Sequence, residues 1–448
     1  MIPLAPPDAT MYWLSRRTHN DQFLLYCFAE SEWETPRLRD EVVRRCAAIP
    51  ELRVRLRSDP TGLSYPVWVP AEFDPDQTVR HRLDRSRWPE LLTALGRLLG
   101  TGVDASICPW RLHIFRGIQD SPTPDPLVTV VVLQISHALV DGRGASRIAR
   151  ALFNGGGPDA AVAPKPHTVS RSRIALRALR GGVTLPLGTA RTLRHGFAAG
   201  RARSKLAELT AAGLIPPPAS GYPPGPLNTP GEITGRAARV LVFPAQDFRV
   251  PGRSVTVVGL TAISFALERY LRGRGEDLPR LGAQVPMAVP PRPGVRNNYR
   301  SLGVDLAIGE DDPTRRAAVI AADLSARRER ALHPLLAAQD AVTNALPPVM
   351  LRRDVRSYPI DTVPAEITGH TVVSSVNRGP ADLGFGGAPV RFTGGFPALG
   401  AVMHLTHGIH GMGETVTLSL HADPAVIPDP DSYTDHLRAA MRDIRRAG

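Results

Sequence analysis

One histidine in this chain stands where a catalytic base could be held rigidly. His137 follows a continuous apolar and largely β-branched run at residues 127–135, and Asp141 and Gly142 come four and five positions after it. Histidine suits a general base because its unperturbed pKa is about 6.5. Acyl transfer from a thioester to an alcohol or amine needs such a base, together with donors for the oxyanion of the tetrahedral intermediate. The segment 136–142 (SHALVDG) therefore makes His137 a candidate catalytic residue.

The other two residues of this HxxxDG pattern have candidate structural roles beside the base. Asp141 could turn the loop back and pair with an arginine, and Gly142 could permit a close backbone approach. The pattern also occurs by chance, and a histidine at a strand end is commonly a hydrogen-bonded surface residue. The surrounding elements must therefore decide between these interpretations.

The elements around His137 follow the order strand, loop, helix. Residues 127–135 predict a strand buried on both faces, and residues 145–153 predict a helix. Residues 155–230 are rich in proline, glycine and arginine, with one helix-compatible piece at 191–212, and indicate a crossover between two lobes. Further predicted elements are helices at 36–49, 260–272, 313–332 and 432–444, a strand at 238–243, and an alternating strand at 415–420 with one solvent-exposed face.

The length of the chain and its net charge limit the number of domains and the kinds of binding partner that we expect. A chain of 448 residues favours two domains, and we expect an N-terminal lobe at 1–165, the crossover at 166–230 and a C-terminal lobe at 231–448. The net charge of +12 comes almost entirely from arginine, because Lys165 and Lys205 are the only lysines, and a GC-rich genome would explain it. We find no aromatic-interleaved basic strand, zinc-ligand spacing or recognition-helix motif, so we do not expect nucleic-acid binding.

The chain also lacks the patterns of export. The N-terminal residues show no secretory signal, and no apolar run approaches the length that spans a bilayer. Cys27, Cys46 and Cys108 are widely spaced and predict unpaired thiols. These features together predict a soluble cytoplasmic protein.

The HxxxDG motif after a buried strand, in a chain with a Pro-rich crossover, resembles the chloramphenicol acetyltransferase-like superfamily of acyltransferases and condensation domains. An ordered series of segments is similar to bacterial wax ester synthase/diacylglycerol acyltransferase-type proteins: 3–9, 49–56, 109–113, 226–228, 284–286, 373–376 with 379–380, and 422–424 near 427–429. The resemblance implies an α/β (α+β) fold of two lobes, each a mixed sheet with flanking helices, and an active-site tunnel between them. It also implies direct transfer without an acyl-enzyme, in which His137 deprotonates the acceptor and then protonates the departing thiolate. No metal or permanent cofactor is implied; the co-substrate is acyl-CoA or a phosphopantetheine thioester, including one on an acyl carrier protein.

Several positions depart from those relatives. Ser136 stands where many have a first histidine, Thr256-Val257 replaces their Asn-Asp pair, and Ala288 replaces a serine. Arg292 lies two positions late relative to their arginine and could still pair with Asp141. These changes argue against wax ester or triacylglycerol synthesis and favour a specialised acceptor in secondary metabolism.

Two further segments contain candidate site residues. Ser374, Ser375 and Asn377 could donate to the oxyanion or the pantetheine arm, although serine and asparagine also favour turns. His404, His407 and His410 recur at intervals of three; in a strand His407 would point away from the other two, which argues against a shared metal. The resemblance places this segment near the tunnel, so His404 is a candidate substrate contact beside the alternative of a satisfied polar role. Residues 382–386 (DLGFG) resemble a structural element of plant BAHD acyltransferases.

Three functions remain open from sequence: a coenzyme A-dependent O- or N-acyltransferase, a condensation-type enzyme that takes its donor from a carrier protein, and a non-catalytic relative that only binds. The intact His137 and Asp141 argue against the third. The arginine-rich piece at 171–203 could contact an anionic membrane or the phosphates of coenzyme A, or form a solvated basic face.

Overall fold

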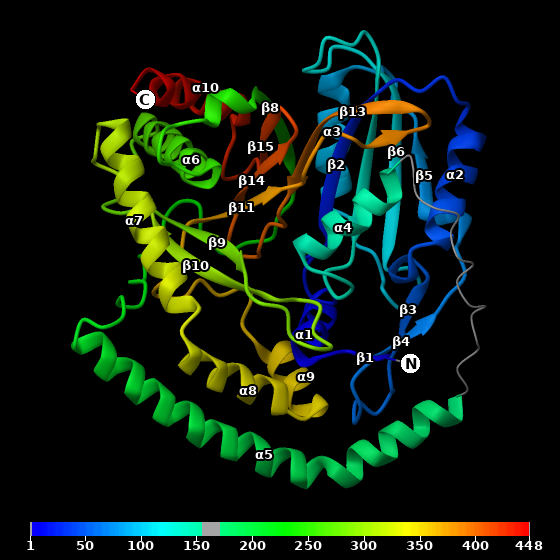
Figure 1. Ribbon diagram of the computed structural model, residues 1–448, viewed down its shortest axis with the longest axis vertical. Coiled ribbons are helices and arrows are strands. Elements are labelled where there is room, and N and C mark those ends of the chain that lie inside the picture. Colours follow the sequence, from blue (N-terminus) through cyan, green and yellow to red (C-terminus); the bar gives the residue numbers. More distant parts are fainter. Residues whose placement is uncertain (1, 155–170, 448) are drawn as a thin grey trace.

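The computed structural model describes residues 2–154 and 171–447, so the lobe boundary predicted at residue 165 lies outside the described residues. Within them, two six-stranded mixed sheets form two lobes side by side (Figure 1). The N-terminal sheet has the spatial order β12 (Gly384–Phe385), β13 (Ala388–Phe396), β2 (Gln22–Ala29), β7 (Val128–Ile135), β6 (Trp110–Ile118) and β5 (Thr78–His81). The C-terminal sheet has the order β10 (Tyr299–Asp305), β9 (Gly282–Ala288), β11 (Thr371–Asn377), β14 (Leu405–Met412), β15 (Thr415–Ala422) and β8 (Ala237–Pro244).

The described helices outside the crossover are α1 (Pro6–Leu14), α2 (Thr35–Ala47), α3 (Trp88–Leu99) and α4 (Gly142–Phe153) in the N-terminal half, and α6 (Val255–Gly273), α7 (Pro313–Ala331), α8 (Ala337–Ala345), α9 (Pro348–Ser357) and α10 (Pro430–Ala447) in the C-terminal half. Helices α1, α8 and α9 lie below the two large sheets, where α1 packs on α8 and α9 (Figure 1). A small sheet of β1 (Ile2–Pro3), β4 (Val67–Pro70) and β3 (Val54–Arg57) completes the set. No described helix has an apolar stretch long enough to cross a bilayer.

The predicted central strand is β7, and it is buried along its whole length. Its odd-numbered side chains Val131, Leu133 and Ile135 pack in the cluster formed with α2 and α4. Its even-numbered side chains Val130 and Val132 pack on the other face with α3. Because both faces of β7 are buried, all of its side chains must be compatible with a core, which explains the continuous apolar run.

β12 and β13 follow β11 in the chain but belong to the N-terminal sheet, where β13 pairs antiparallel with β2. β13 also covers the face of β15 that alternation predicted to be solvent-exposed, and that prediction is wrong. Thr417, Ser419 and His421 on that face are at most 2% exposed, and Gly395 N lies 3.4 Å from Ser419 Oγ. The polar side chains of β15 thus pack against β13 and are not exposed to water.

The described part of the crossover contains one long helix, α5 (Arg171–Ala211). The helix predicted at 191–212 forms its C-terminal half, and the helix starts 20 residues earlier than predicted. Gly181-Gly182 and Pro186 are helix-breaking residues, yet they lie inside α5. The glycine permits close packing: a Cβ on Gly181 would lie 2.0 Å from the Leu63 carbonyl oxygen. Contact with the protein body therefore outweighs the local preference of these residues.

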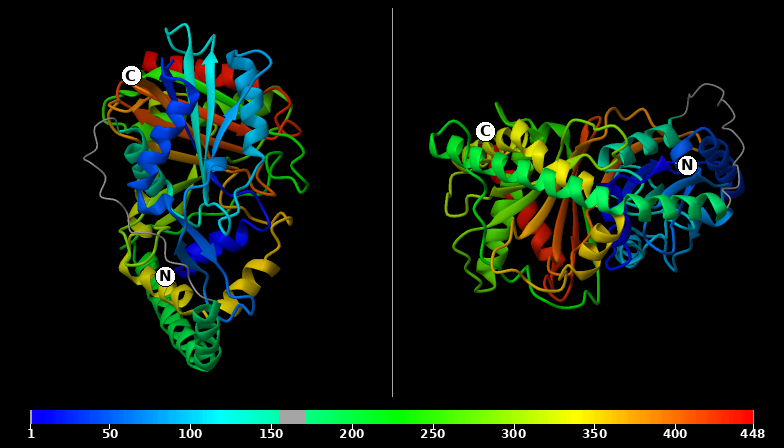
Figure 2. Two further views of the ribbon diagram at one scale, coloured as in Figure 1. Left: turned by 90° about the vertical axis from the view of Figure 1, so that its right-hand side faces the viewer. Right: turned by 90° about the horizontal axis from the view of Figure 1, so that it is seen from below.

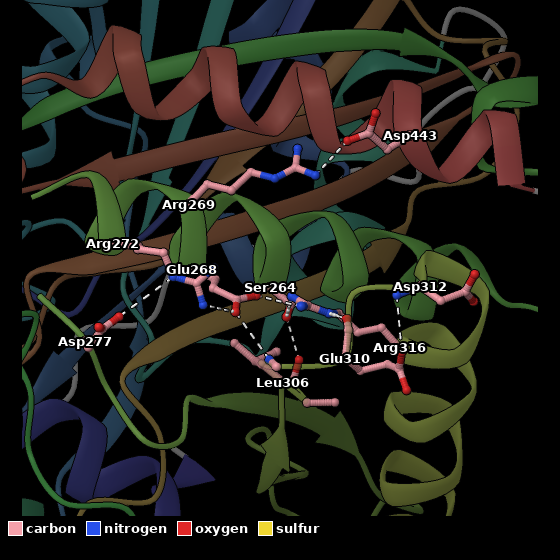
Figure 3. Close-up of polar contacts among 12 residues, drawn as sticks. Ser264, Glu268, Arg269, Arg272, Asp277, Leu306, Glu310, Asp312, Arg316 and Asp443 are labelled. Carbon is pink, nitrogen blue, oxygen red and sulfur yellow. Dashed lines mark hydrogen bonds and ion pairs between the residues drawn. The ribbon is translucent and has the colours of Figure 1, made fainter. Parts of the chain in front are cut away.

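A buried ion pair joins α6 to α7 in the C-terminal lobe (Figure 3). The Arg316 side chain is fully buried and donates to Glu268 Oε2 at 2.6 Å, to Ser264 Oγ at 3.0 Å and to the Glu310 carbonyl oxygen at 2.7 Å. Its guanidinium also lies 3.6 Å from the Phe265 ring centroid. All of its hydrogen-bonding nitrogens are satisfied, as burial of a charge demands.

Candidate active site

His137 lies in the turn between β7 and α4, and its ring contacts the loop between β9 and β10 of the other lobe. The turn is fixed by hydrogen bonds from Ser136 N to the Pro109 carbonyl oxygen at 2.8 Å and from Leu139 N to the Ser136 carbonyl oxygen at 2.9 Å. The Ser136 side chain is 1% exposed and accepts from Ala138 N at 3.3 Å. Ser136 therefore shapes the turn, and its hydroxyl is not available to a substrate.

The ring of His137 is held by Asn297, which lies in the loop between β9 and β10 of the opposite lobe. Asn297 Oδ1 lies 2.7 Å from His137 Nδ1, and Asn297 Nδ2 donates to the His137 carbonyl oxygen at 2.8 Å and to Asp8 Oδ1 at 2.9 Å. A carbonyl and a carboxylate only accept, so they fix the orientation of the amide. Oδ1 can then only accept from Nδ1–H, which leaves the lone pair of the neutral ring on Nε2.

The third member of this arrangement is a buried carboxylate. Asp8, on α1, is 1% exposed and also accepts from the main-chain nitrogens of Asn297 at 2.9 Å and Arg296 at 3.1 Å. Burial raises the pKa of Asp8, while these hydrogen bonds act in the opposite direction. Asp8 thereby fixes the main chain and the side chain of the residue that holds His137.

Burial lowers the pKa of His137 below its usual value, while the hydrogen bond to Asn297 raises it. A neutral ring at neutral pH is the form that a general base requires. The Tyr299 ring lies 5.7 Å from the His137 ring between centroids, and it is the neighbouring aromatic side chain on β10.

Asp141 connects the two lobes through its carboxylate. Oδ1 accepts from Gly144 N at 2.9 Å and so caps the N-terminus of α4, and Oδ2 accepts from Asn298 N at 3.2 Å. The predicted pair with Arg292 is not formed: Arg292 Nη1 lies 3.5 Å from Asp340 on α8. Arg292 reaches Asp141 only through Asn298, whose Oδ1 accepts from Arg292 N at 3.1 Å. The main-chain nitrogen of Asn298 thus donates to the Asp141 carboxylate where the predicted arginine does not.

The two glycines at the N-terminus of α4, Gly142 and Gly144, differ in how closely other atoms approach them. A Cβ on Gly142 would have Gln22 Oε1 at 3.8 Å, which is ordinary contact. A Cβ on Gly144 would lie 2.8 Å from Val140 Cβ, so the close approach expected at Gly142 falls two residues later.

The candidate donors on β11 divide between the two faces of the sheet. Ser375 Oγ lies 2.8 Å from Thr256 Oγ1 on α6, whereas Ser374 points to the opposite face, because neighbouring strand residues alternate. Asn377 is exposed, and its Oδ1 accepts from Gly379 N at 2.9 Å. Within the described chain, none of the three shares a hydrogen bond with His137.

The three spaced histidines do not converge. Both nitrogens of His404 have partners, Asp423 Oδ2 at 2.9 Å and the Thr229 carbonyl oxygen at 2.8 Å, and the residue is 2% exposed. Both ring nitrogens thus have partners within the protein, which supports the alternative of a satisfied polar role. His407 contacts Thr371 and Tyr433, and His410 lies on the other face of β14. No group of three metal-ligating side chains occurs among residues 2–154 and 171–447.

Sequence reasoning missed Asp8, Asn297 and Asn298. Asp8 belongs to the N-terminal segment similar to the acyltransferase relatives, and two consecutive asparagines after a Pro-rich loop are an unusual signal. Neither signal indicates that segments almost 290 residues apart meet at His137.

Replacing Asn297 with leucine is expected to lower kcat about 10²-fold, because the ring loses its fixed orientation. Only the neutral ring accepts a proton, so kcat/KM should rise with pH through the pKa of His137 and then level off. The lost hydrogen bond raised this pKa, so the rising limb should move to lower pH in the variant. Rates between pH 4 and 9, with melting temperatures, would check this; an unmoved limb would show that Asn297 only supports its loop.

Family models match both halves of the chain. Residues 4–242 match the wax ester synthase/diacylglycerol acyltransferase catalytic domain, and residues 296–445 match the WS/DGAT C-terminal domain. A candidate diacylglycerol O-acyltransferase of Mycobacterium tuberculosis H37Rv, Rv1760, is 28% identical over 308 residues, which is 63% of this chain and 57% of that protein. A second from the same organism, Rv2484c, is 23% identical over 438 residues, 92% of this chain and 85% of that protein.

Solved structures share the two-lobe fold. The wax ester synthase/diacylglycerol acyltransferase from Marinobacter aquaeolei VT8 aligns with a TM-score of 0.65 and 19% identity over 99% of both chains. The starter condensation domain of rhizomide synthetase, in complex with C8-CoA, aligns with a TM-score of 0.57 and 13% identity over 99% of this chain and 94% of that one. From these matches, the chain belongs to the wax ester synthase/diacylglycerol acyltransferase family and has its two-lobe acyltransferase fold.

Proposed function

We propose that this protein transfers an acyl group from a thioester to a hydroxyl or amine acceptor, with His137 as the general base and without an acyl-enzyme. The observation that carries the proposal is the fixed Asn297 amide, which leaves the lone pair of His137 on Nε2. A free, uncharged ring nitrogen between the lobes is what proton removal from an acceptor requires.

The proposed reaction has two proton transfers at one atom. Nε2 takes the proton of the acceptor O–H or N–H as the acceptor attacks the thioester carbonyl carbon, and a tetrahedral oxyanion forms. The intermediate then collapses: the C–S bond breaks, and Nε2 returns the proton to the departing thiolate. Ser374, on the face of β11 opposite to Thr256, is our candidate donor to the oxyanion or the pantetheine arm.

We propose acyl-CoA as the donor and an alcohol as the acceptor, which agrees with the family name and with the complex of the rhizomide synthetase domain with C8-CoA. The replacements at Ser136, Thr256 and Val257 favour a specialised acceptor. The second candidate is a condensation-type reaction on carrier-protein-bound substrates, which the likeness to the first condensation domain of the calcium-dependent antibiotic synthetase supports (TM-score 0.57).

The same octanoyl group, offered as its coenzyme A ester and on a carrier protein, distinguishes the donors. We expect free thiol to be released from octanoyl-CoA in the presence of alcohols, with the ester detected by mass spectrometry. Turnover only with the loaded carrier protein would favour the condensation-type reaction. No turnover with either donor, across alcohols and amines, would favour a binding protein without catalysis.

A further inference from the structure

The outer face of α5 carries large apolar side chains in solvent. The helix lies along one side of the molecule beneath both lobes (Figures 1 and 2). Its exposed apolar residues recur mostly every three or four positions, and their exposed fractions lie between 47% and 75%: Leu176, Leu179, Val183, Leu187, Leu193 and Phe197. At 3.6 residues per turn, this spacing places them in one stripe. We call these six residues the α5 stripe.

The α5 stripe is not a face left over from incomplete packing, because the opposite side of α5 is already packed on the body. Ala178, Ala199, Ala202 and Leu206 are buried. Thr192 Oγ1 also donates to the Ala345 carbonyl oxygen of α8 at 2.9 Å. Pro186 interrupts the helical hydrogen bonds near the middle of α5, and the helix is curved with its concave side toward the body (Figure 1).

Basic side chains of α5 accompany the stripe. α5 contains eight arginines and Lys205, and its one acidic residue is Glu208 near the C-terminal end. Arg173, Arg180, Arg191, Arg194 and Arg201 are exposed, and in the described part of the chain none of them forms an ion pair. The arginines of α7 behave differently: Arg327, for example, pairs with Asp323. Among the residues that the structure describes, no acidic side chain therefore neutralises these five arginines.

We propose that α5 binds in the plane of an anionic lipid membrane, with the α5 stripe inserted between the lipids and its arginines on the phosphates. An apolar stripe together with uncompensated cations on one long helix is the pattern of interfacial membrane helices. Pairing with a second copy of the chain would place two basic helices against each other. Nucleic acid would use the charge but leave the apolar stripe without a partner.

Helix α8 connects α5 to the loop that supports the active site. α5 packs on α8, and Asp340 of α8 accepts from Arg300 at 2.7 Å and pairs with Arg292. These arginines flank Asn297, which holds His137. A membrane-bound α5 thus lies on the side of the protein that supports the β9–β10 loop.

Sedimentation with vesicles tests the proposal without measuring activity, so its outcome is independent of the proposed reaction. We expect binding to vesicles of phosphatidylglycerol and phosphatidylcholine in equal parts, and little binding to phosphatidylcholine alone. The double substitution Val183→Asp and Phe197→Asp should weaken binding about tenfold or more, since it removes two apolar groups and adds repulsive charge. Val319→Asp, at a 48% exposed residue of α7, should leave binding unchanged.

A fluorophore provides a second readout that does not depend on a disruptive variant. Cys27, Cys46 and Cys108 are free but buried, so an environment-sensitive dye will react preferentially with the thiol of Phe197→Cys. Its emission should shift to the blue on anionic vesicles, whereas the same dye on Val319→Cys should not respond. Absent sedimentation, an unresponsive dye at position 197, or a dimer in solution that the Asp substitutions dissociate would each overturn the proposal.

Discussion

Alanine in place of His137 should lower kcat for thioester consumption by about 10²–10⁴-fold, the range that a positioned general base contributes. The reason is geometric: Asn297 holds Nδ1, so Nε2 is the basic atom presented between the lobes, and alanine removes it. KM for the thioester should change little, because the ring is proposed to act on the acceptor proton. Initial rates of thiol release over a range of acyl-CoA concentrations would measure both quantities.

His436→Ala is the matched control, since it removes a histidine of α10 that lies against Tyr270 and away from the site. It should retain wild-type kcat, and both variants should keep the melting temperature of the parent. A His137→Ala protein that retains its fold and turns over at near wild-type rates would contradict the assignment of the base.

Glu268→Leu should lower the free energy of unfolding by about 3–5 kcal/mol, because it leaves the Arg316 guanidinium buried without its counter-charge. Arg316 is fully buried, and Glu268 is the carboxylate paired with it. Glu268 Oε1 also accepts from Gly309 N at 3.3 Å, so the substitution frees a second polar group. Urea denaturation followed by circular dichroism would measure the loss.

The double variant Glu268→Leu with Arg316→Leu should recover part of that stability, since it removes both charges together. The matched control is Asp435→Ala, which breaks the exposed pair with Arg438 and should cost about 0–1 kcal/mol. A Glu268→Leu loss no larger than that of Asp435→Ala would show that the buried pair contributes no more than a surface pair.

Elements with strong periodicity are predictable from sequence. The buried β7, the helix α7 with Asp312 at its N-cap and the strand β8 occur where hydrophobic patterning and capping residues place them. Predictions that depend on a neighbour from elsewhere in the chain fail. The alternating pattern of β15 predicts an exposed face that β13 covers, and glycine and proline predict a shorter α5 because they disfavour helix locally.

The same division holds for the site. His137 and Asp141 are adjacent in sequence to a recognisable strand, so local reasoning reaches them. Asp8 and Asn297 are separated by 289 positions and meet through hydrogen bonds that no spacing encodes. From its sequence position alone, Arg292 is expected to pair with Asp141. In the structure, the loop between β9 and β10 places the Arg292 side chain beside Asp340 instead. Charge partners in loops follow the path of the backbone, which sequence periodicity does not determine.

The position of β13 has a consequence for synthesis on the ribosome. β2 bonds to β7 on one side and to β13 on the other, so the edge of β2 stays open until residue 396 has left the exit tunnel. An open edge rich in Phe, Leu and Tyr is prone to pair with another nascent chain. The first half of the gene should therefore yield an aggregating product when expressed alone, and co-expression with the second half should rescue it.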